Sequence, residues 1–167
     1  MDFRFESFVE NWCTIYKPLQ HVPGERSKNK RFFLTDTTYL GMADFMANIG
    51  NRASSCVVME SSVEGTLVKG LDVQQHTIYF FVKATDTQDG PAAREALLEA
   101  KTHMNEFLAY LRQKQREEMP ELGNINLDDR NGYQSVGPLY NGWWGVYLTI
   151  EDTRQVRLCV DRDKYIS

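Results

Sequence analysis

The sequence predicts an α+β fold in which a mainly antiparallel sheet is packed by one long helix. Residues 137–150 read GPLYNGWWGVYLTI, where turn residues precede a run that is apolar on both faces, and residues 77–85, TIYFFVKAT, form a second such run. Strands of that kind belong inside a sheet that is covered on two sides. Residues 91–117 instead repeat apolar side chains at helical spacing, over roughly 40 Å at 1.5 Å per residue. At 167 residues the chain suits one core, so residues 1–167 are expected to form one domain.

The first segment is predicted to be an aromatic amphipathic helix. Its apolar residues, spaced three or four apart, are Phe5, Phe8, Trp12, Ile15 or Tyr16, and Leu19. Pro18 ends the helix, because proline disfavours helical geometry in the residue before it. So broad a stripe is expected to cover one face of the sheet, and the alternative is that it docks on another subunit. The candidate interface aromatics are Phe5, Phe8, Trp12 and Trp143.

A polar segment with clustered positive charge follows the first helix. Residues 20–31 read QHVPGERSKNKR, and their basic residues are Arg26, Lys28, Lys30 and Arg31. An exposed loop explains this composition without any further role. The alternative is a contact loop that reaches an acidic surface on a partner.

The middle of the chain predicts a short helix and a pair of strands. Asp36, Thr37 and Thr38 offer N-caps for an amphipathic helix that Gly50 stops. Residues 55–69 are predicted to be a strand with a bend at Glu64 and Gly65, and residues 70–75 then lead into the strand at 77–85. These two strands are expected to pair as antiparallel neighbours across a short connection.

The last third of the chain predicts a C-terminal β-hairpin. Residues 121–131 form a polar link whose acidic residues lack the glycine and the closing glutamate of a calcium loop. The strand that ends at Ile150 is expected to turn at residues 152–155 and to return through Val156, Leu158 and Val160. This closing strand alternates apolar and polar residues, as an edge strand with one wet face does.

The sequence contains no recognisable catalytic, cofactor-binding or metal-binding pattern. His21, His76 and His103 lack partners at metal-ligand spacing, and the nearest case, His103 with Glu99 or Glu106, is typical of a surface ion pair. Neither a glycine-rich phosphate loop nor a Gly-x-Ser-x-Gly motif occurs. The cysteines are expected to be buried, reduced thiols, and they are Cys13, Cys56 and Cys159. The pattern favours a protein that is not an enzyme.

Composition makes some partners and locations improbable. A formal net charge of -4 argues against nucleic-acid binding, which needs a clustered positive surface. The one feature in favour of base stacking is the strand face that carries Tyr79, Phe81 and Lys83. No apolar run approaches the roughly 20 residues that span a bilayer. Because the start of the chain lacks a secretion-signal layout, we expect a cytoplasmic protein.

The order of predicted elements resembles that of the tail-terminator or tail-completion proteins of long-tailed bacteriophages. The stretches that carry the resemblance are residues 8–16, residues 77–87 ahead of the long helix, and residues 137–150 followed by Leu158, Cys159 and Val160. The resemblance implies a small α+β subunit without a cofactor, which forms a ring with copies of itself and contacts neighbouring tail or connector proteins. It also implies that the subunit is built into a virion or a phage-like particle.

The expected function is therefore that of a structural subunit of a phage or prophage-type tail, at its terminator or at the head-tail joint. The alternative is a small-ligand-binding module or enzyme with a pocket between the sheet and the long helix. That pocket would lie near Tyr79, Trp143 and Trp144. An assembly subunit should associate through an apolar surface, whereas a ligand-binding domain should enclose a cavity.

Overall fold

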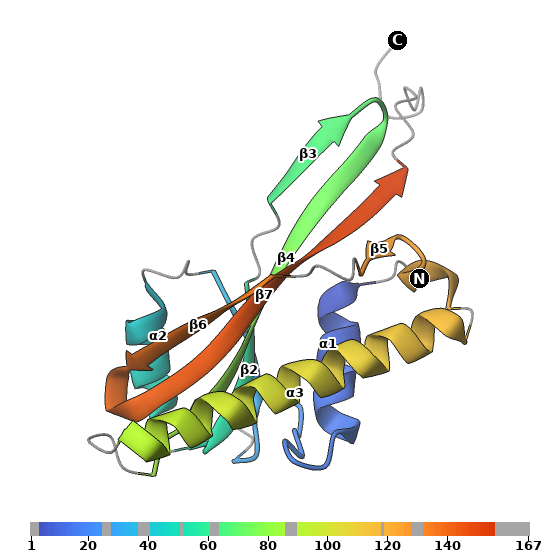
Figure 1. Cartoon of the computed structure of the whole chain (residues 1–167). Helices are drawn as coiled ribbons and strands as arrows, with labels where there is room; N and C mark the ends of the chain where they lie inside the picture. Colours follow the sequence, from blue (N-terminus) through green and yellow to red (C-terminus); the bar gives the residue numbers. More distant parts are fainter. Residues whose placement is uncertain are drawn as a thin grey trace.

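The fold is of the α+β class, with helices on both faces of a seven-stranded, mostly antiparallel sheet (Figure 1). The computed structural model describes residues 4–24, 28–36, 41–50, 52–60, 64–85, 90–117, 119–127 and 132–155. The helices are α1 (Phe5–Ile15), α2 (Met42–Ile49) and α3 (Gly90–Arg116), with short 3-10 turns η2 (Pro120–Leu122) and η3 (Tyr140–Gly142). The strands are β1 (Phe32–Thr35), β2 (Ser55–Glu60), β3 (Glu64–Val68), β4 (Leu71–Lys83), β5 (Ile125–Asn126), β6 (Tyr133–Leu139) and β7 (Trp143–Gln155).

Two long strands, β4 and β7, form the spine of the sheet. They pair antiparallel along their whole length, from Leu71 opposite Gln155 to Lys83 opposite Trp143. Beside one half of this spine, β2 pairs with β4, β1 pairs parallel with β2, and β6 pairs with β7. Beside the other half, β3 pairs with β4 and β5 pairs with β7. The two halves of the spine thus have different neighbouring strands, and the spine crosses Figure 1 diagonally from one half to the other.

One face of the spine packs on α1 and α3. Because side chains alternate along a strand, the residues of β4 and β7 that point to this side are every second one, and they are Ile78, Phe80, Val82, Val146, Leu148 and Ile150. The α1 stripe supplies Phe5, Phe8 and Trp12, all buried against this face. The prediction that the aromatic helix covers the sheet is confirmed. α1 ends at Ile15, three residues before Pro18.

The long helix α3 lies along the same face as predicted. Its start presents small residues to the sheet and its later turns present larger ones; the buried members are Ala92, Ala96, Ala100, His103, Met104, Phe107 and Leu111. The Phe107 ring lies edge-on to that of Trp12 and tilted against that of Phe80, with ring centroids 5.2 and 5.8 Å away. Small residues allow the helix to approach the sheet closely, whereas the aromatic cluster fills the wider space near α1.

The opposite face of the spine packs on the short helix α2. Met42, Met46 and Ile49 cover Tyr79, Phe81 and Trp143, which occupy the alternate positions of β4 and β7. Gly50 ends α2 with a positive φ of 56°, a backbone conformation that glycine adopts without strain. The predicted two-sided cover of both central strands is therefore confirmed.

Several predicted strand boundaries are wrong. Glu64 and Gly65 do not form a bend but begin β3, and residues 71–75, predicted to be a connection, are the first part of β4. β7 continues as far as Gln155, through the residues predicted to turn. The Gly137-Pro138 pair lies in an irregular part of β6 instead of a turn, and η3 makes the connection to β7. The C-terminal hairpin that the structure describes is thus β6–β7; the predicted return strand at residues 156–160 lies outside the described residues.

Candidate interaction surface

The most distinctive exposed feature is an arm that extends beyond the helices. We define the arm as β3, the turn Lys69–Gly70, residues 71–75 of β4 and residues 151–155 of β7. Figure 1 shows it projecting from the helical body as a narrow, twisted ribbon. Three large apolar side chains near its end are exposed: Leu67 by 58%, Val68 by 46% and Leu71 by 38%. Val68 and Leu71 are paired on one face of the ribbon, whereas Leu67, opposite Asp72, points to the other face. Both faces of the arm end thus carry exposed apolar side chains.

A tight turn shapes the end of the arm. Val68 pairs with Leu71, so the hairpin loop consists of Lys69 and Gly70 alone. Both residues have positive φ, 50° and 82°, as a two-residue type I′ turn requires. This turn has the twist of the flanking strands, and it places the apolar pair Val68 and Leu71 on one face at the very end of the ribbon.

Polar contacts hold the base and the flank of the arm. The Asp152 carboxylate is fully buried and accepts hydrogen bonds on Oδ2 from Nε and Nη2 of Arg154, at 2.8 and 2.6 Å. Gln74 donates to Oδ2 of Asp72 at 2.6 Å, and the Thr77 and Thr149 hydroxyls lie 3.3 Å apart across the spine. The Arg154–Asp152 and Gln74–Asp72 contacts each lie within one strand, whereas the threonine pair joins β4 to β7.

The arm also carries an open strand edge. Within the part of the chain that the structure describes, β3 pairs only with β4, so the other side of its backbone has no strand partner. Unpaired N–H and C=O groups along an edge can add a strand from another chain. The arm therefore offers both apolar side chains and backbone hydrogen-bonding groups to a partner.

The predicted contact loop is held to the body by its last residue. The Arg31 guanidinium donates from Nη1 to the carbonyl oxygens of Lys30 and Arg52, at 3.0 and 3.1 Å. Lys30 lies over the ring of Phe33, with 5.3 Å from Nζ to the centroid, whereas Lys28 is exposed. Arg26 lies outside the described residues. Of the three described members of the predicted positive cluster, Lys28 is exposed, and Lys30 and Arg31 are half-buried.

The four aromatics predicted as interface candidates lie inside the core of this chain. Phe5, Phe8 and Trp12 are buried under α1, and Trp143 is buried on the other face under α2. Their apolar surface is buried between the sheet and the helices that pack on its two faces. They are therefore not exposed as an interface on this chain, whereas the arm carries three of the exposed large apolar side chains, Leu67, Val68 and Leu71.

The pocket expected between the sheet and the long helix does not have the predicted lining. Tyr79 and Trp143 point toward α2, whereas Trp144 packs on the opposite side, where α3 lies. The sheet itself separates these side chains, because successive residues of a strand point to opposite faces. For the same reason Tyr79 and Phe81, buried beneath α2, do not form the exposed stacking surface that nucleic-acid binding would need.

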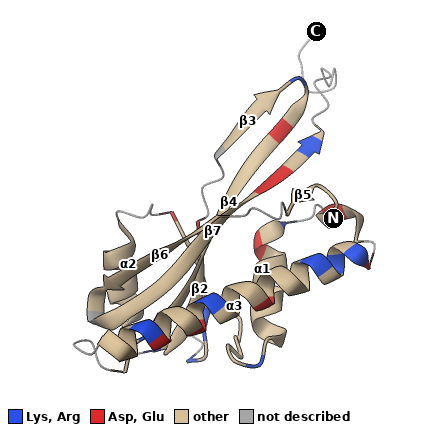
Figure 2. Cartoon of the chain, viewed as in Figure 1, with Lys and Arg blue, Asp and Glu red and all other residues tan. Residues whose placement is uncertain are grey.

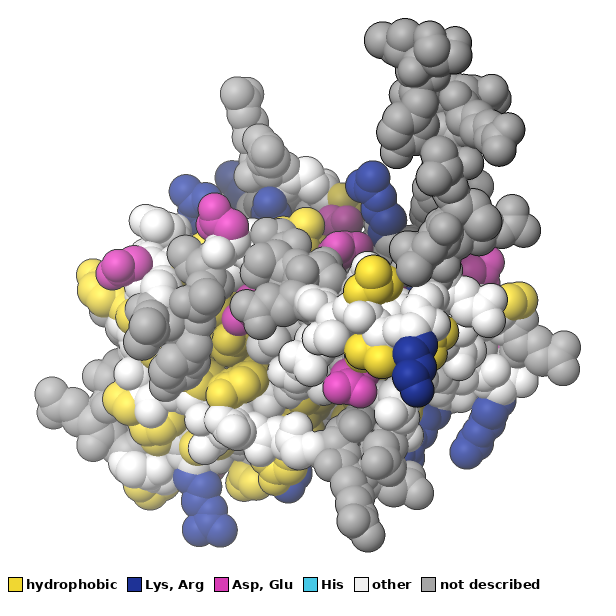
Figure 3. All heavy atoms as spheres, turned by 90° about the horizontal axis from the view of Figure 1, so that it is seen from above, with side chains coloured by type: hydrophobic (Ala, Val, Ile, Leu, Met, Phe, Trp, Pro, Cys, Tyr) yellow, Lys and Arg dark blue, Asp and Glu magenta, His cyan; other side chains and the backbone are white. Residues whose placement is uncertain are grey.

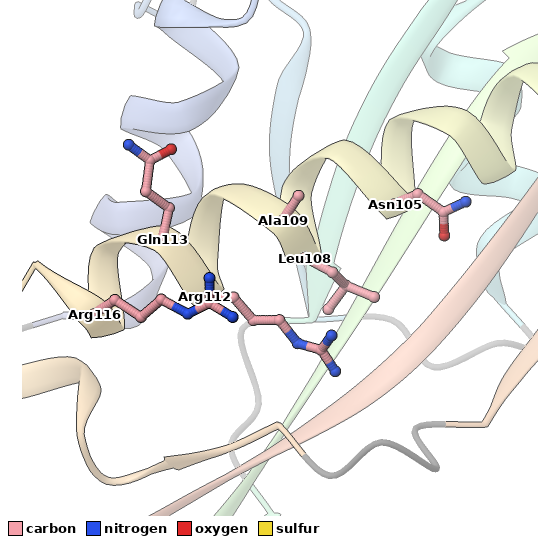
Figure 4. A pocket seen from close by; sticks show the side chains of 6 residues that line it. All are labelled: Asn105, Leu108, Ala109, Arg112, Gln113 and Arg116. Atoms are coloured by element: carbon pink, nitrogen blue, oxygen red, sulfur yellow. The ribbon is translucent and has the colours of Figure 1, made fainter.

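A hollow does occur on the outer side of α3. It has a volume of about 440 Å³, and Figure 4 shows its lining: Asn105, Leu108, Ala109, Arg112, Gln113 and Arg116. The two arginine side chains extend along the helix surface in that view instead of converging on one point. Figure 2 shows basic and acidic residues distributed along α3. This is the composition of a solvated helix face.

The buried histidines act within the fold. Nδ1 of His21 accepts hydrogen bonds from the backbone N–H groups of Arg31 and Phe32, at 2.9 and 3.3 Å. His103 is buried, contrary to the expectation of a surface residue, and its Nδ1 lies 3.1 Å from the Tyr16 hydroxyl. Burial lowers the pKa of His103 and of His76. Burial outweighs the opposing effect of the nearby carboxylates, Glu99 for His103 and Asp152 for His76, and it favours the neutral imidazole in both.

Metal-binding and thiol chemistry find no support in the described part of the chain. Groups of three or more His, Cys, Asp or Glu side chains that could hold a metal ion are absent from it. Cys13 and Cys56 are free and buried, as predicted, and burial raises the pKa of both thiols. Cys159 lies outside the described residues. Of the described helices, none is both long and apolar enough to span a membrane.

No protein-family model matches this chain, and a search of curated proteins found no match.

The arm could have been recognised in the sequence. Residues 66–73 read TLVKGLDV, which places Lys-Gly between two short runs rich in apolar residues. A two-residue loop ending in glycine is a hairpin signal. The signal is weak because the residue before the glycine is Lys instead of Asn or Asp. The strand predicted at residues 55–69 also included the first half of this hairpin.

Proposed function

We propose that this protein is a non-enzymatic structural subunit of a phage or prophage-type tail, at the tail terminator or the head-tail joint. It acts by assembling into a ring with copies of itself and by contacting neighbouring tail or connector proteins. The observation that carries this proposal is the arm, whose exposed leucine and valine side chains extend beyond a body that is closed by helices on both faces. Assembly inside the cytoplasm into a phage-like particle is part of the same proposal.

The shape of the chain supports association between copies. A ring arises when one surface patch binds a different patch on the next subunit and the rotation closes. A projecting arm and a compact body provide two different patches of this kind. The end of the arm lies away from the body, so it can contact the body of a neighbouring subunit. A small-ligand-binding role receives less support, since the two arginines that line the outer hollow of α3 do not converge on one point (Figure 4).

The test is the mass of the purified protein in solution, measured by light scattering over a range of concentration and salt. We expect a discrete multimer with a mass several times 19.3 kDa that dissociates on dilution. The variant Leu67→Lys should shift the equilibrium toward the monomer. The matched control is Leu98→Lys, because Leu98 is 56% exposed on α3 and outside the arm. A strict monomer at every concentration would contradict self-assembly.

A further inference from the structure

A buried histidine lies where the arm joins the helical body. His76 follows the arm residues 71–75 on β4, and only 3% of it is exposed. Its side chain points to the α1 side of the sheet, because it occupies an alternate position in phase with Ile78 and Phe80. Among the described residues visible from above in Figure 3, basic and acidic side chains reach the surface, whereas no histidine does. A group that titrates near neutral pH is thus enclosed at the base of the arm.

The His76 imidazole packs on an aromatic ring and forms no hydrogen bond with the described residues. Its ring centroid lies 4.9 Å from that of Phe5, which is in the first turn of α1 and buried. Both ring nitrogens are buried without a partner. A neutral imidazole has one N–H donor and one acceptor, and a buried polar group that is left unpaired costs about 1–3 kcal/mol. The ring would therefore gain hydrogen bonds if it moved toward a polar neighbour.

A carboxylate lies on the same face of the neighbouring strand. On β7, Ile150 is directly opposite His76 and Asp152 is opposite Gln74, so His76 and Asp152 are diagonal neighbours in the ladder. The Cα atoms of such neighbours are roughly 7–8 Å apart, which is within reach of an aromatic side chain. Oδ2 of Asp152 accepts from Arg154, whereas its Oδ1 is buried with no partner in the part of the chain that the structure describes. Asp152 can therefore accept a further hydrogen bond.

The charges around His76 act on it in opposite directions. Asp152 of β7 and Glu6 of α1 favour a protonated imidazole, whereas Arg154 of β7 opposes it. Burial opposes it most strongly, and as a result the pKa of His76 is lowered. On β4 itself, Asp72 is four positions away on the same face, and the two residues of β5, which pairs with β7 beside Asp152, are uncharged. The ring is thus kept neutral by its burial against Phe5, in spite of two carboxylates nearby.

We infer that protonation of His76 moves its ring from Phe5 toward Asp152 and thereby loosens the first turn of α1. The imidazolium has two N–H donors, and in the new position it forms an ion pair with the unpartnered Oδ1 of Asp152. The first turn of α1 then loses a packing contact at a helix start where Arg4 provides no side-chain cap. A shift of this kind is a pH-sensitive switch between two arrangements of one chain, and it does not depend on the proposed function.

The first experiment is amide hydrogen exchange between about pH 7.5 and 5.5, a range that spans the ordinary titration of histidine. Rates are expressed as protection relative to an unstructured chain. The Phe8 N–H donates to the Arg4 carbonyl at 3.2 Å and reports on the first turn of α1, whereas the Gly50 N–H donates to the Met46 carbonyl at 3.1 Å and reports on α2. We expect the protection of Phe8 to fall about fivefold, since one unit of pKa difference between two states is worth up to tenfold. Gly50 should change less.

Three variants assign the response to its residues. His76→Gln should abolish the pH response at Phe8. His103→Gln is the matched control and should retain it, because His103 is also a buried histidine with a lowered pKa but belongs to α3. Asp152→Asn should reduce it, because the amide oxygen can still accept from Arg154 while the charge that attracts the imidazolium is gone. Responses of equal size in His76→Gln and His103→Gln would overturn the inference.

The second experiment follows the ring itself in the wild-type protein, so it decides the question even if a variant fails to fold. The protonation of His76 and its proton–proton contacts with the Phe5 ring are measured by NMR over the same pH range. We expect the contacts to weaken as the imidazole becomes protonated. If His76 stays neutral throughout, or if it is protonated with these contacts intact, the inference is wrong. Self-assembly is tested separately by light scattering, so either proposal can fail alone.

Discussion

Gly145 of β7 lies directly opposite Phe81 of β4, and the Phe81 ring occupies the space where a side chain on Gly145 would be. A Cβ atom at this position would lie 2.6 Å from Cδ1 of Phe81 and 2.5 Å from the carbonyl oxygen of Phe80. Contacts this short force the backbone or the ring to move. The close approach of the two spine strands under α2 therefore depends on the glycine.

Gly145→Ala should destabilise the protein by about 1–3 kcal/mol, the usual cost of adding atoms to a filled core. The measurement is the free energy of unfolding in urea. Gly90→Ala is the control, because a Cβ on Gly90 meets nothing within 4 Å. Equal stabilities of the two variants would show that the core around Phe81 is less tightly packed than described.

Removing the His21 imidazole should loosen the segment that leads into β1. His21→Ala leaves the N–H groups of Arg31 and Phe32 without their shared acceptor, and we expect a loss of about 1–3 kcal/mol. Hydrogen exchange of these two amides should become faster. Glu10→Gln should cost much less, since the amide oxygen can still accept from Nε2 of His21, now 3.2 Å from Oε1 of Glu10. Unchanged exchange in His21→Ala would contradict this role.

Phe107→Ala should remove the centre of the aromatic cluster between α1, α3 and the sheet. Phe107 is completely buried and its ring contacts those of Phe8, Trp12 and Phe80. The expected cost is about 3–5 kcal/mol, measured by urea or thermal unfolding. Leu98→Ala on the exposed side of the same helix should change stability by less than about 0.5 kcal/mol. Comparable losses in the two variants would be inconsistent with the observed orientation of α3.

Stability should decrease as the pH falls below about 6.5, the ordinary pKa of histidine. Burial lowers the pKa of His76 and of His103, so the folded protein binds fewer protons than the unfolded chain in this range. Protonation then favours unfolding, and stability rises with pH until both groups are neutral in both states. The urea concentration at the midpoint of unfolding should therefore decrease as the pH is lowered from about 7.5 to about 5.5. A double variant, His76→Gln with His103→Gln, should show a flatter dependence, and an identical slope would exclude these residues as the cause.

The thiols of Cys13 and Cys56 should react only when the protein unfolds. Both are buried, and burial raises their pKa, so the reactive thiolate is rare in the folded state. The measurement is labelling with a thiol reagent in a Cys159→Ser background, with and without denaturant. Labelling in native buffer at the rate seen in denaturant would mean that the core opens readily.

Periodicity was sufficient to predict the elements that are buried. Phe80 and Phe81, on adjacent positions of one strand, required cover on both faces, and the structure provides α3 on one side and α2 on the other. The Phe5, Phe8 and Trp12 stripe likewise predicted that α1 packs on the sheet. In each case burial requires apolar residues at regular positions, and this pattern can be recognised in the sequence alone.

The arm and the interior roles of the histidines were harder to predict. Residues 71–75 alternate weakly because no helix covers them, so burial leaves no clear pattern there. His21 stabilises a loop through neighbours ten and eleven residues away, a distance at which sequence spacing carries no information. Trp143 is an intermediate case: its apolar character was evident, whereas its assignment to the core instead of an interface depended on the position of α2.

The continuity of β4 and β7 has a mechanical consequence. The same two strands form the arm and the centre of the body, and they remain paired from Leu71 opposite Gln155 to Lys83 opposite Trp143. A pull on the end of the arm acts on both strands at once, because Leu71 and Gln155 lie side by side there. Tension applied at this end is therefore carried by two continuous strands into the centre of the molecule, between the helices.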